Sequence, residues 1–167
     1  VYSVIALRLR VYPMNHPVIQ KALDGLERFT IWEGDVRRLE ACQSPVWDTA
    51  LALVALGDAG MHREDPALRR AGAWLAAEEV RLRGDWAVRR PHIAPGGWAF
   101  EYENDNYPDV DDTAEVIMAL RGANVPAAEP AIERGVAWTL GMQCDDGGWA
   151  AFDAENTQAL CREPVFC

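Results

Sequence analysis

The chain has 167 residues, of which 50% are hydrophobic and 25% charged, and it carries a formal net charge of −10. This composition indicates a globular protein rather than a disordered one, and the excess of acidic residues argues against nucleic-acid binding. No apolar run approaches the roughly 20 residues that span a bilayer, and apolar residues precede basic ones at the N-terminus, which is not the order of a signal peptide.

Helical patterns dominate the chain. Asp65 and Pro66 have the N-cap and first-turn chemistry of a helix start, and Pro45 marks another. Glycines close several of the patterns, as expected at helix ends. Strands are expected only as a brief pairing of Val88 with the Trp98 region. The predicted helices cover residues 17–31, 46–56, 66–83, 111–121 and 130–142.

An internal repeat relates two of these helices. Residues 46–56 and 110–120 are identical at six of eleven positions, and Gly-Gly-Trp-Ala occurs at both 96–99 and 147–150. A unit that cannot bury its own apolar face implies stacked helical hairpins, with the short apolar helices inside and the charged ones outside. Trp47 aligns with Asp111 in this repeat. Its indole is therefore expected either to share one central space with Asp111 or to pack in an ordinary core.

Three carboxylates crowd the start of the helix at 111–121: Asp109, Asp111 and Asp112. Each ionised neighbour makes the next carboxyl harder to ionise, so one of them can stay protonated near neutral pH and act as a Brønsted acid. The alternative is an ordinary acidic helix start in which Asp109 is the N-cap. The carboxylates alone leave both interpretations open.

The run at 109–114, Asp-Val-Asp-Asp-Thr-Ala, resembles the acid motif of the squalene–hopene cyclases. Segments 43–50, 96–100 and 143–149 are similar to the same family, and the resemblance extends over about residues 16–157. It implies an all-α fold, part of an α/α toroid of helical hairpins with Gln-Trp loops. Residues 1–167 would be a partial catalytic domain, an internal piece of a larger two-domain cyclase. Trp98 and Trp149 are expected to be structural, since buried indoles usually serve packing.

The resemblance also implies a chemistry. Asp111 would donate a proton to the terminal double bond of squalene, with Asp109 and Asp112 keeping it acidic and oriented. Substrate-binding roles fall to three aromatic residues whose π faces can stabilise cationic stages: Trp47, Phe100 and Phe152. The product would be hopene or hopanol, in hopanoid biosynthesis, and the enzyme an isomerase. The scheme needs neither a metal ion nor an organic cofactor.

Three other functions compete with this interpretation. A metal-dependent prenyl-diphosphate enzyme would use the acidic cluster to hold Mg²⁺, although the spacing of these carboxylates differs from that class and no basic cluster adjoins them. A helical-repeat interaction scaffold would explain the repeat without catalysis. A cyclase of another, shorter or oxygenated polyprenyl substrate would keep the family and change the substrate.

Location and assembly follow from the resemblance alone. It implies peripheral, monotopic attachment to the cytoplasmic face of the plasma (inner) membrane, where squalene dissolves, and homodimers are common in the family. The isolated chain is expected to be inactive, because the family's histidine partner of the catalytic aspartate would lie beyond Cys167. The cysteines have no zinc or redox spacing and are expected to be reduced thiols: Cys42, Cys144, Cys161 and Cys167.

Overall fold

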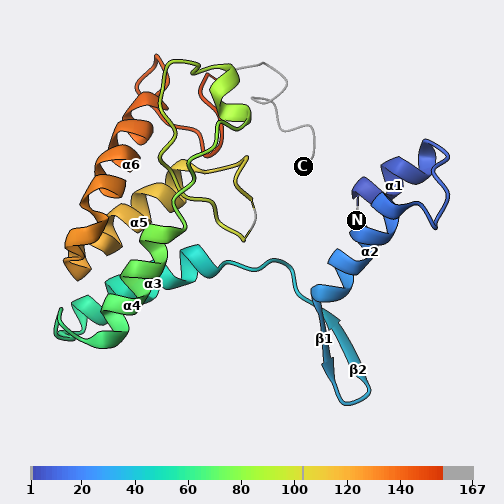
Figure 1. The fold of residues 1–167 in the computed structure, drawn as a ribbon, viewed down its shortest axis with the longest axis horizontal. Helices are drawn as coiled ribbons and strands as arrows, with labels where there is room; N and C mark the ends of the chain where they lie inside the picture. Colours follow the sequence, from blue (N-terminus) through green and yellow to red (C-terminus); the bar gives the residue numbers. More distant parts are fainter. Residues whose placement is uncertain (1, 103, 156–167) are drawn as a thin grey trace. The chain divides into compact units, whose positions relative to one another are not determined.

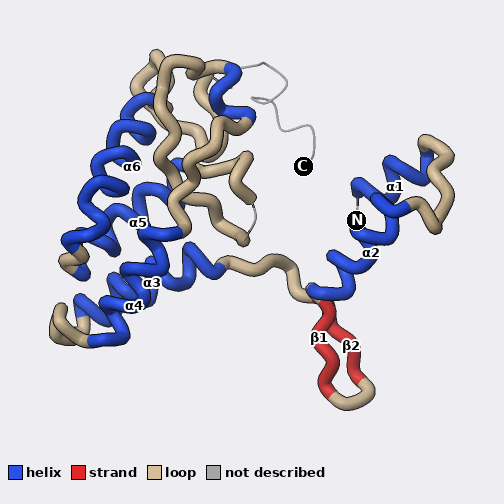
Figure 2. Tube along the Cα trace, viewed as in Figure 1, coloured by secondary structure: helices blue, strands red, loops and turns tan. Residues whose placement is uncertain are grey.

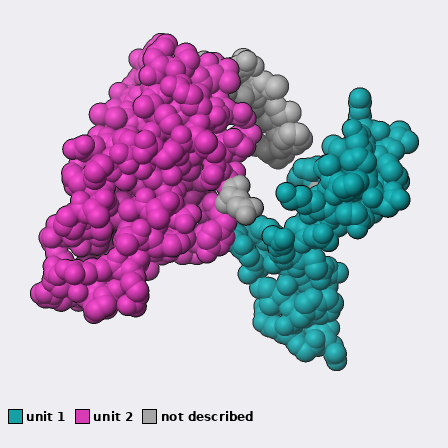
Figure 3. All heavy atoms as spheres, in the orientation of Figure 1, with its two compact units in different colours: residues 1–43 teal, residues 44–167 magenta. Residues whose placement is uncertain are grey.

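The computed structural model describes residues 2–102 and 104–155, and divides the chain into two compact units. The first unit is Val1–Gln43 and the second is Ser44–Cys167 (Figure 3). In the described part of the chain, no helix combines the length and the apolar character that a bilayer crossing requires. Cys42 and Cys144 carry free thiols, and the other two cysteines lie outside the described residues.

The first unit contains two helices, α1 (Tyr2–Leu9) and α2 (Pro17–Arg28), followed by a hairpin of β1 (Thr30–Glu33) and β2 (Val36–Leu39). The α2 helix begins as its sequence predicts. Pro17 occupies the first turn, and the side chain of His16 accepts a hydrogen bond from the Val18 N–H at 3.3 Å.

The hairpin corrects the expectation of a helix over 17–31. The helix ends at Arg28, and Thr30 pairs with Leu39 in an antiparallel register that continues to Glu33 and Val36. Gly34 adopts a φ of 61° in the two-residue turn, a conformation that glycine reaches without a steric penalty. The turn and the strand residues together favour a hairpin after Arg28 over a longer helix.

The second unit is a pair of helical hairpins (Figures 1 and 2). Its helices are α3 (Pro45–Asp58), α4 (Pro66–Ala77), α5 (Val110–Ala123) and α6 (Glu129–Gly141), with short 3₁₀ turns η1 (Asp85–Val88) and η2 (Pro126–Ala128). The two repeat-related helices, α3 and α5, pack against each other, and each also packs against the second helix of its own hairpin. The predicted helical hairpins are therefore confirmed, with boundaries shifted by a few residues.

Two clusters form the core of this unit. The larger lies among α3, α4, α5 and α6 and includes Trp98, which is fully buried and donates its indole N–H to the Leu75 carbonyl at 2.7 Å. The smaller contains Trp86 and Trp138, whose ring centroids lie 5.8 Å apart in an edge-to-face arrangement. The structural role predicted for Trp98 is thus confirmed, because an indole buried among four helices stabilises their packing.

The connection between the hairpins corrects two further expectations. The α4 helix ends at Ala77 rather than at residue 83, because the chain turns and the Val80 N–H donates to the Gly97 carbonyl at 2.8 Å. Val88 does not pair with the Trp98 region: it lies in η1, and Trp98 instead forms an isolated bridge with Asp109. That bridge brings the Gly-Trp loop onto the start of α5.

Candidate functional site

The acid segment begins α5. Asp109 is its N-cap, and its carboxylate accepts a hydrogen bond from the Asp112 N–H at 2.7 Å. The Asp109 N–H donates to the Trp98 carbonyl at 3.0 Å, and the Val110 N–H donates to the Ala151 carbonyl at 2.8 Å. Three amides at this helix start are therefore satisfied by one side chain and two neighbouring loops.

The three carboxylates occupy different environments. Asp109 and Asp112 are 4% and 3% exposed, whereas the Asp111 side chain is exposed. Burial raises the pKa of Asp112 from 3.8 to about 8, and the hydrogen bond and charge of Asp109 act in the same direction. Burial also raises the pKa of Asp109, although hydrogen bonds with Asp112 oppose the rise. The buried pair therefore retains a proton near neutral pH.

A pocket of about 380 Å³ lies beside this helix start. The ring centroids of Trp47 and Phe100, two of its walls, lie 6.5 Å apart with their planes inclined by 38°. All six residues predicted from the sequence line this pocket: Asp109, Asp111, Asp112, Trp47, Phe100 and Phe152. The pocket thus combines an acidic floor with aromatic walls, an arrangement that can deliver a proton and stabilise a cation.

The internal repeat accounts for this convergence. Trp47 and Asp111, which occupy equivalent positions on α3 and α5, line the same pocket, as the alignment of the two helices predicts. Packing of α3 against α5 brings the two helix starts together. Of the two interpretations of Trp47, the shared central space is therefore the one that the structure supports.

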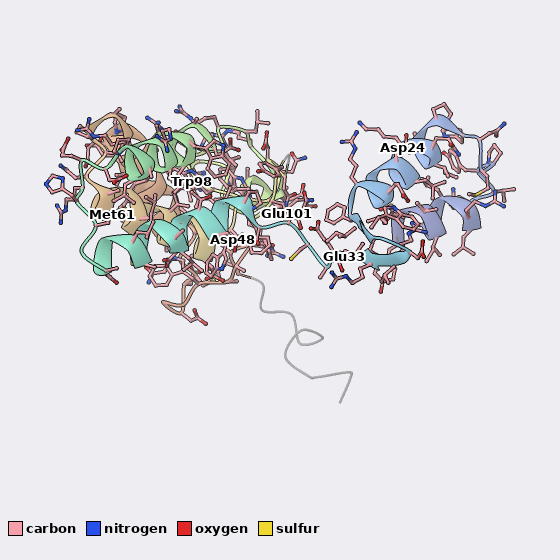
Figure 4. The ribbon with its side chains drawn as sticks, turned by 90° about the horizontal axis from the view of Figure 1, so that it is seen from below. Asp24, Glu33, Asp48, Met61, Trp98 and Glu101 are labelled. Carbon is pink, nitrogen blue, oxygen red and sulfur yellow. The ribbon has the colours of Figure 1, made fainter. Side chains whose placement is uncertain are left out.

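Three lining residues were not assigned to the site from the sequence: Glu101, Asn104 and Ala151. The repeated Gly-Gly-Trp-Ala segment, at 96–99 and 147–150, could have identified two of them. Alignment of Trp98 with Trp149 makes Phe100 equivalent to Ala151 and Glu101 equivalent to Phe152, and all four of these residues line the pocket. Figure 4 shows Glu101 on the loop beyond Trp98, at the end of the unit opposite to Met61.

The Gln143–Trp149 loop departs from the expected arrangement in one respect. The resemblance implies that glutamine caps a helix end, but the Gln143 amide donates to the Gly147 carbonyl at 2.7 Å and closes its own loop. The Trp149 indole N–H instead donates to the Thr139 carbonyl in the last turn of α6, also at 2.7 Å. Trp149 is 46% exposed and is therefore not the buried indole that the prediction assumed, but this bond ties its loop to the end of α6.

No group of three or more histidine, cysteine and acidic side chains within residues 2–102 and 104–155 is arranged to hold a metal ion. Asp109 and Asp112 direct their carboxylates at the helix start and at each other instead.

Comparisons with known proteins place the chain in a family. The chain is 42% identical to the squalene–hopene cyclase of Alicyclobacillus acidocaldarius over 99% of its length and 27% of that relative's. It is 44% identical to the Bradyrhizobium diazoefficiens squalene–hopene cyclase, over 86% of the chain and 23% of the relative. It is also 41% identical to a dammaradiene synthase of Dryopteris crassirhizoma, over 94% of the chain and 23% of the relative.

The chain thus spans about a quarter of the length of the curated relatives it matches. A family model described as the squalene-hopene cyclase C-terminal domain matches residues 43–167, which include the whole of the second unit. The chain therefore belongs to the squalene–hopene cyclase family.

Proposed function

We propose that the protein containing this chain cyclises squalene to hopene or hopanol by acid initiation. One observation carries the proposal: three carboxylates and three aromatic side chains of a squalene–hopene cyclase family member line one pocket of about 380 Å³. Squalene and hopene are isomers, so an enzyme that forms hopene would be an isomerase, and the pocket contains the carboxylates and aromatic faces on which the initiating step would depend.

Asp111 is the proposed proton donor, because it is the carboxyl of the motif whose side chain is exposed at the pocket. The π electrons of the terminal double bond form a C–H bond to its proton, which leaves a tertiary carbocation on the neighbouring carbon and a carboxylate on Asp111. Asp109 and Asp112, which retain a proton between them, lie beside Asp111 and fix the start of α5, the helix turn that presents Asp111 to the pocket.

The cation then passes through successive ring closures until a final proton loss gives hopene or capture of water gives hopanol. The π faces of Trp47, Phe100 and Phe152 would stabilise cationic stages, and a dry cavity would prevent early capture of water. Preorganisation of the polyene along these walls determines which closures occur.

The test uses the product of the complete gene that encodes this chain, incubated with squalene in deuterated buffer without Mg²⁺. Pentacyclic products that carry one deuterium from initiation, and their loss in Asp111→Asn, are the expected result. Asp65→Asn is the matched control, because Asp65 caps α4 through the Ala67 N–H at 2.7 Å and asparagine caps a helix equally well.

Three outcomes would contradict the proposal in different ways. A folded protein that forms no product from squalene points to another polyprenyl substrate or to the scaffold. Activity that survives in Asp111→Asn removes Asp111 from the donor role. An absolute requirement for Mg²⁺ would instead favour the prenyl-diphosphate class.

The identity to a dammaradiene synthase favours a second candidate, a cyclase with the same initiation and a different polycyclic product. Both candidate cyclases would initiate in the same way, so both products would carry one deuterium. The ring skeleton of the product is what distinguishes the two candidates. Because both hydrocarbons are isomers of squalene and have the same mass, chromatographic retention and fragmentation of the products against hopene and dammaradiene standards decide between the two candidates.

Peripheral attachment to the cytoplasmic face of the membrane, as a homodimer, is part of the same proposal. The support for membrane attachment is the substrate, since squalene partitions into lipid and must be taken from there. Recovery of the complete protein with membranes, and its release by detergent but not by salt, would be the expected behaviour. Sedimentation of the detergent-solubilised protein tests the dimer.

A further inference from the structure

Residues 151–155 contribute part of the pocket without forming a helix or strand. Ala151 and Phe152 line the pocket, and the Ala151 carbonyl accepts the Val110 N–H at the start of α5. The Phe152 side chain is 54% exposed, so its own packing holds it only in part. The contacts that fix its position are therefore those of the neighbouring residues.

Arg90 and Glu155 provide such a contact from outside the pocket. The Arg90 guanidinium donates to the Gly141 and Gln143 carbonyls at 3.1 and 2.8 Å, and to the Glu155 carboxylate at 2.8 Å. The two side chains are 20% and 27% exposed. Arginine suits this position because its planar donors reach several acceptors at once, and its charge is favourable beside the carbonyls at the end of α6.

Glu155 is held by further contacts. Its carboxylate also accepts the Asp145 N–H at 2.7 Å, and its own N–H donates to the Cys144 sulfur at 3.3 Å. Glu155 has a φ of 57°, a left-handed conformation that is uncommon for a residue with a side chain. Ala154 beside it is fully buried. Phe152 lies three residues away, within about 10 Å of extended chain.

We propose that Arg90 and Glu155 are positioning residues, whose ion pair holds Phe152 at the pocket wall and thereby directs the course of cyclisation. The inference rests on the proposed function. An aromatic face stabilises a cation only within about 6 Å of its ring centre, so a shift of this segment changes which cationic stage is stabilised. Neither residue of the pair lines the pocket or is required to touch substrate.

The test compares Glu155→Gln and Arg90→Lys in the product of the complete gene with squalene as substrate. Both variants are expected to lower kcat about 3- to 10-fold with little change in KM, and to increase incompletely cyclised products, because they loosen a wall rather than a binding group. Glu64→Gln is the control: it breaks an exposed ion pair with Arg69 and should leave the kinetics and the products unchanged.

A double-mutant cycle with Phe152→Ala distinguishes positioning from general stability. If Glu155 acts through Phe152, Glu155→Gln changes the product ratio less than about 2-fold in the Phe152→Ala background, since coupled residues are not additive. Additive effects would overturn the inference, as would a normal product ratio and kcat per folded molecule in Glu155→Gln.

Hydrogen exchange of the peptide that contains residues 150–155 gives a readout that does not depend on the reaction. Faster exchange is expected in Glu155→Gln and not in Glu64→Gln. If the wild-type protein forms no product from squalene, the proposed function fails, while unchanged exchange in Glu155→Gln is the result that refutes the positioning role itself.

Discussion

Asp109, Asp111 and Asp112 lie within one turn of chain but differ in exposure and in hydrogen bonding. Asp109 accepts the Asp112 N–H as the helix cap, and the Asp112 Oδ1 atom is buried without a hydrogen-bond partner in the described part of the chain. A buried carboxylate oxygen in that situation is far costlier than a protonated one. The helix cap and the acid cluster, which are alternatives in the sequence, are therefore both present in the structure.

The pH dependence of stability tests this assignment. Unfolding returns the pKa of Asp112 from about 8 to 3.8, so between these values the folded protein holds a proton that unfolding releases. This carboxyl's stabilising contribution is complete below the unfolded pKa and is lost as the pH rises through the folded pKa. Between pH 5 and 9, Tm of the wild type should fall relative to that of Asp112→Asn.

The measurement is a series of thermal unfolding curves on the product of the complete gene. Asp24→Asn, at an exposed position of α2, controls for the loss of one charge (Figure 4). Parallel pH profiles of the wild type and Asp112→Asn would show that Asp112 is ionised in the folded protein at every pH tested.

At the scale of elements, helix starts follow from local chemistry and helix ends do not. Pro45 and the Asp65-Pro66 pair mark the starts of α3 and α4 in both sequence and structure. The end of α4 depends on Gly97, a partner distant in sequence that accepts the Val80 N–H. Propensity cannot report such a contact, which is why the predicted helix ran on to residue 83.

The missed hairpin has a different cause, because its signal is local. Gly34-Asp35 separates two short runs that begin with the β-branched residues Thr30 and Val36, a pattern typical of a two-residue hairpin turn. The amphipathic pattern that begins at Pro17 continues to Ile31 and overlaps this signal. The hairpin could therefore be predicted from local sequence, provided that the strand pattern around the turn is distinguished from the helical pattern that precedes it.

Glu79, just beyond α4, joins the helical hairpin of α3 and α4 to α6. Its carboxylate accepts two hydrogen bonds from Arg134, at 2.7 and 2.6 Å, and its side chain is only 6% exposed. Glu79→Gln should lower the free energy of unfolding by about 1–2 kcal/mol, because it removes the charge of a buried acceptor of two guanidinium hydrogen bonds, and exposure of the Arg134 side chain (34%) limits the loss. Urea unfolding of the variant measures this loss.

The exposed pair of Glu64 and Arg69 supplies the comparison. Glu64→Gln should change the unfolding free energy by less than about 0.5 kcal/mol, as expected for a solvated ion pair. Equal effects of the two substitutions would mean that Glu79 does not couple the helices.

At the scale of the molecule, the second unit is a section of the α/α toroid of its family, built from two helical hairpins. The site residues that could be predicted are the carboxylates of the acid motif, the aromatic residues of the segments that resemble the family, and Trp47, whose repeat position matches that of Asp111. Arg90 and Glu155 could not be predicted, because their pairing depends on the path of a loop that has no periodicity. The repeat thus places Trp47 beside Asp111, whereas the contacts that hold the segment of Phe152 depend on the folded path of the loop.

The same section explains why the 167-residue chain should not cyclise squalene by itself. The pocket is open to water in this part of the protein: Phe152 is 54% exposed and the Asp111 side chain is exposed. A carbocation formed there would be captured by water before successive ring closures, and an extended polyene would have little wall to fold against. The purified chain, folded by circular dichroism, is therefore expected to give no pentacyclic product, while the product of the complete gene is active under identical conditions. Hopene from the isolated chain would show instead that this pocket alone excludes water well enough for the full cascade.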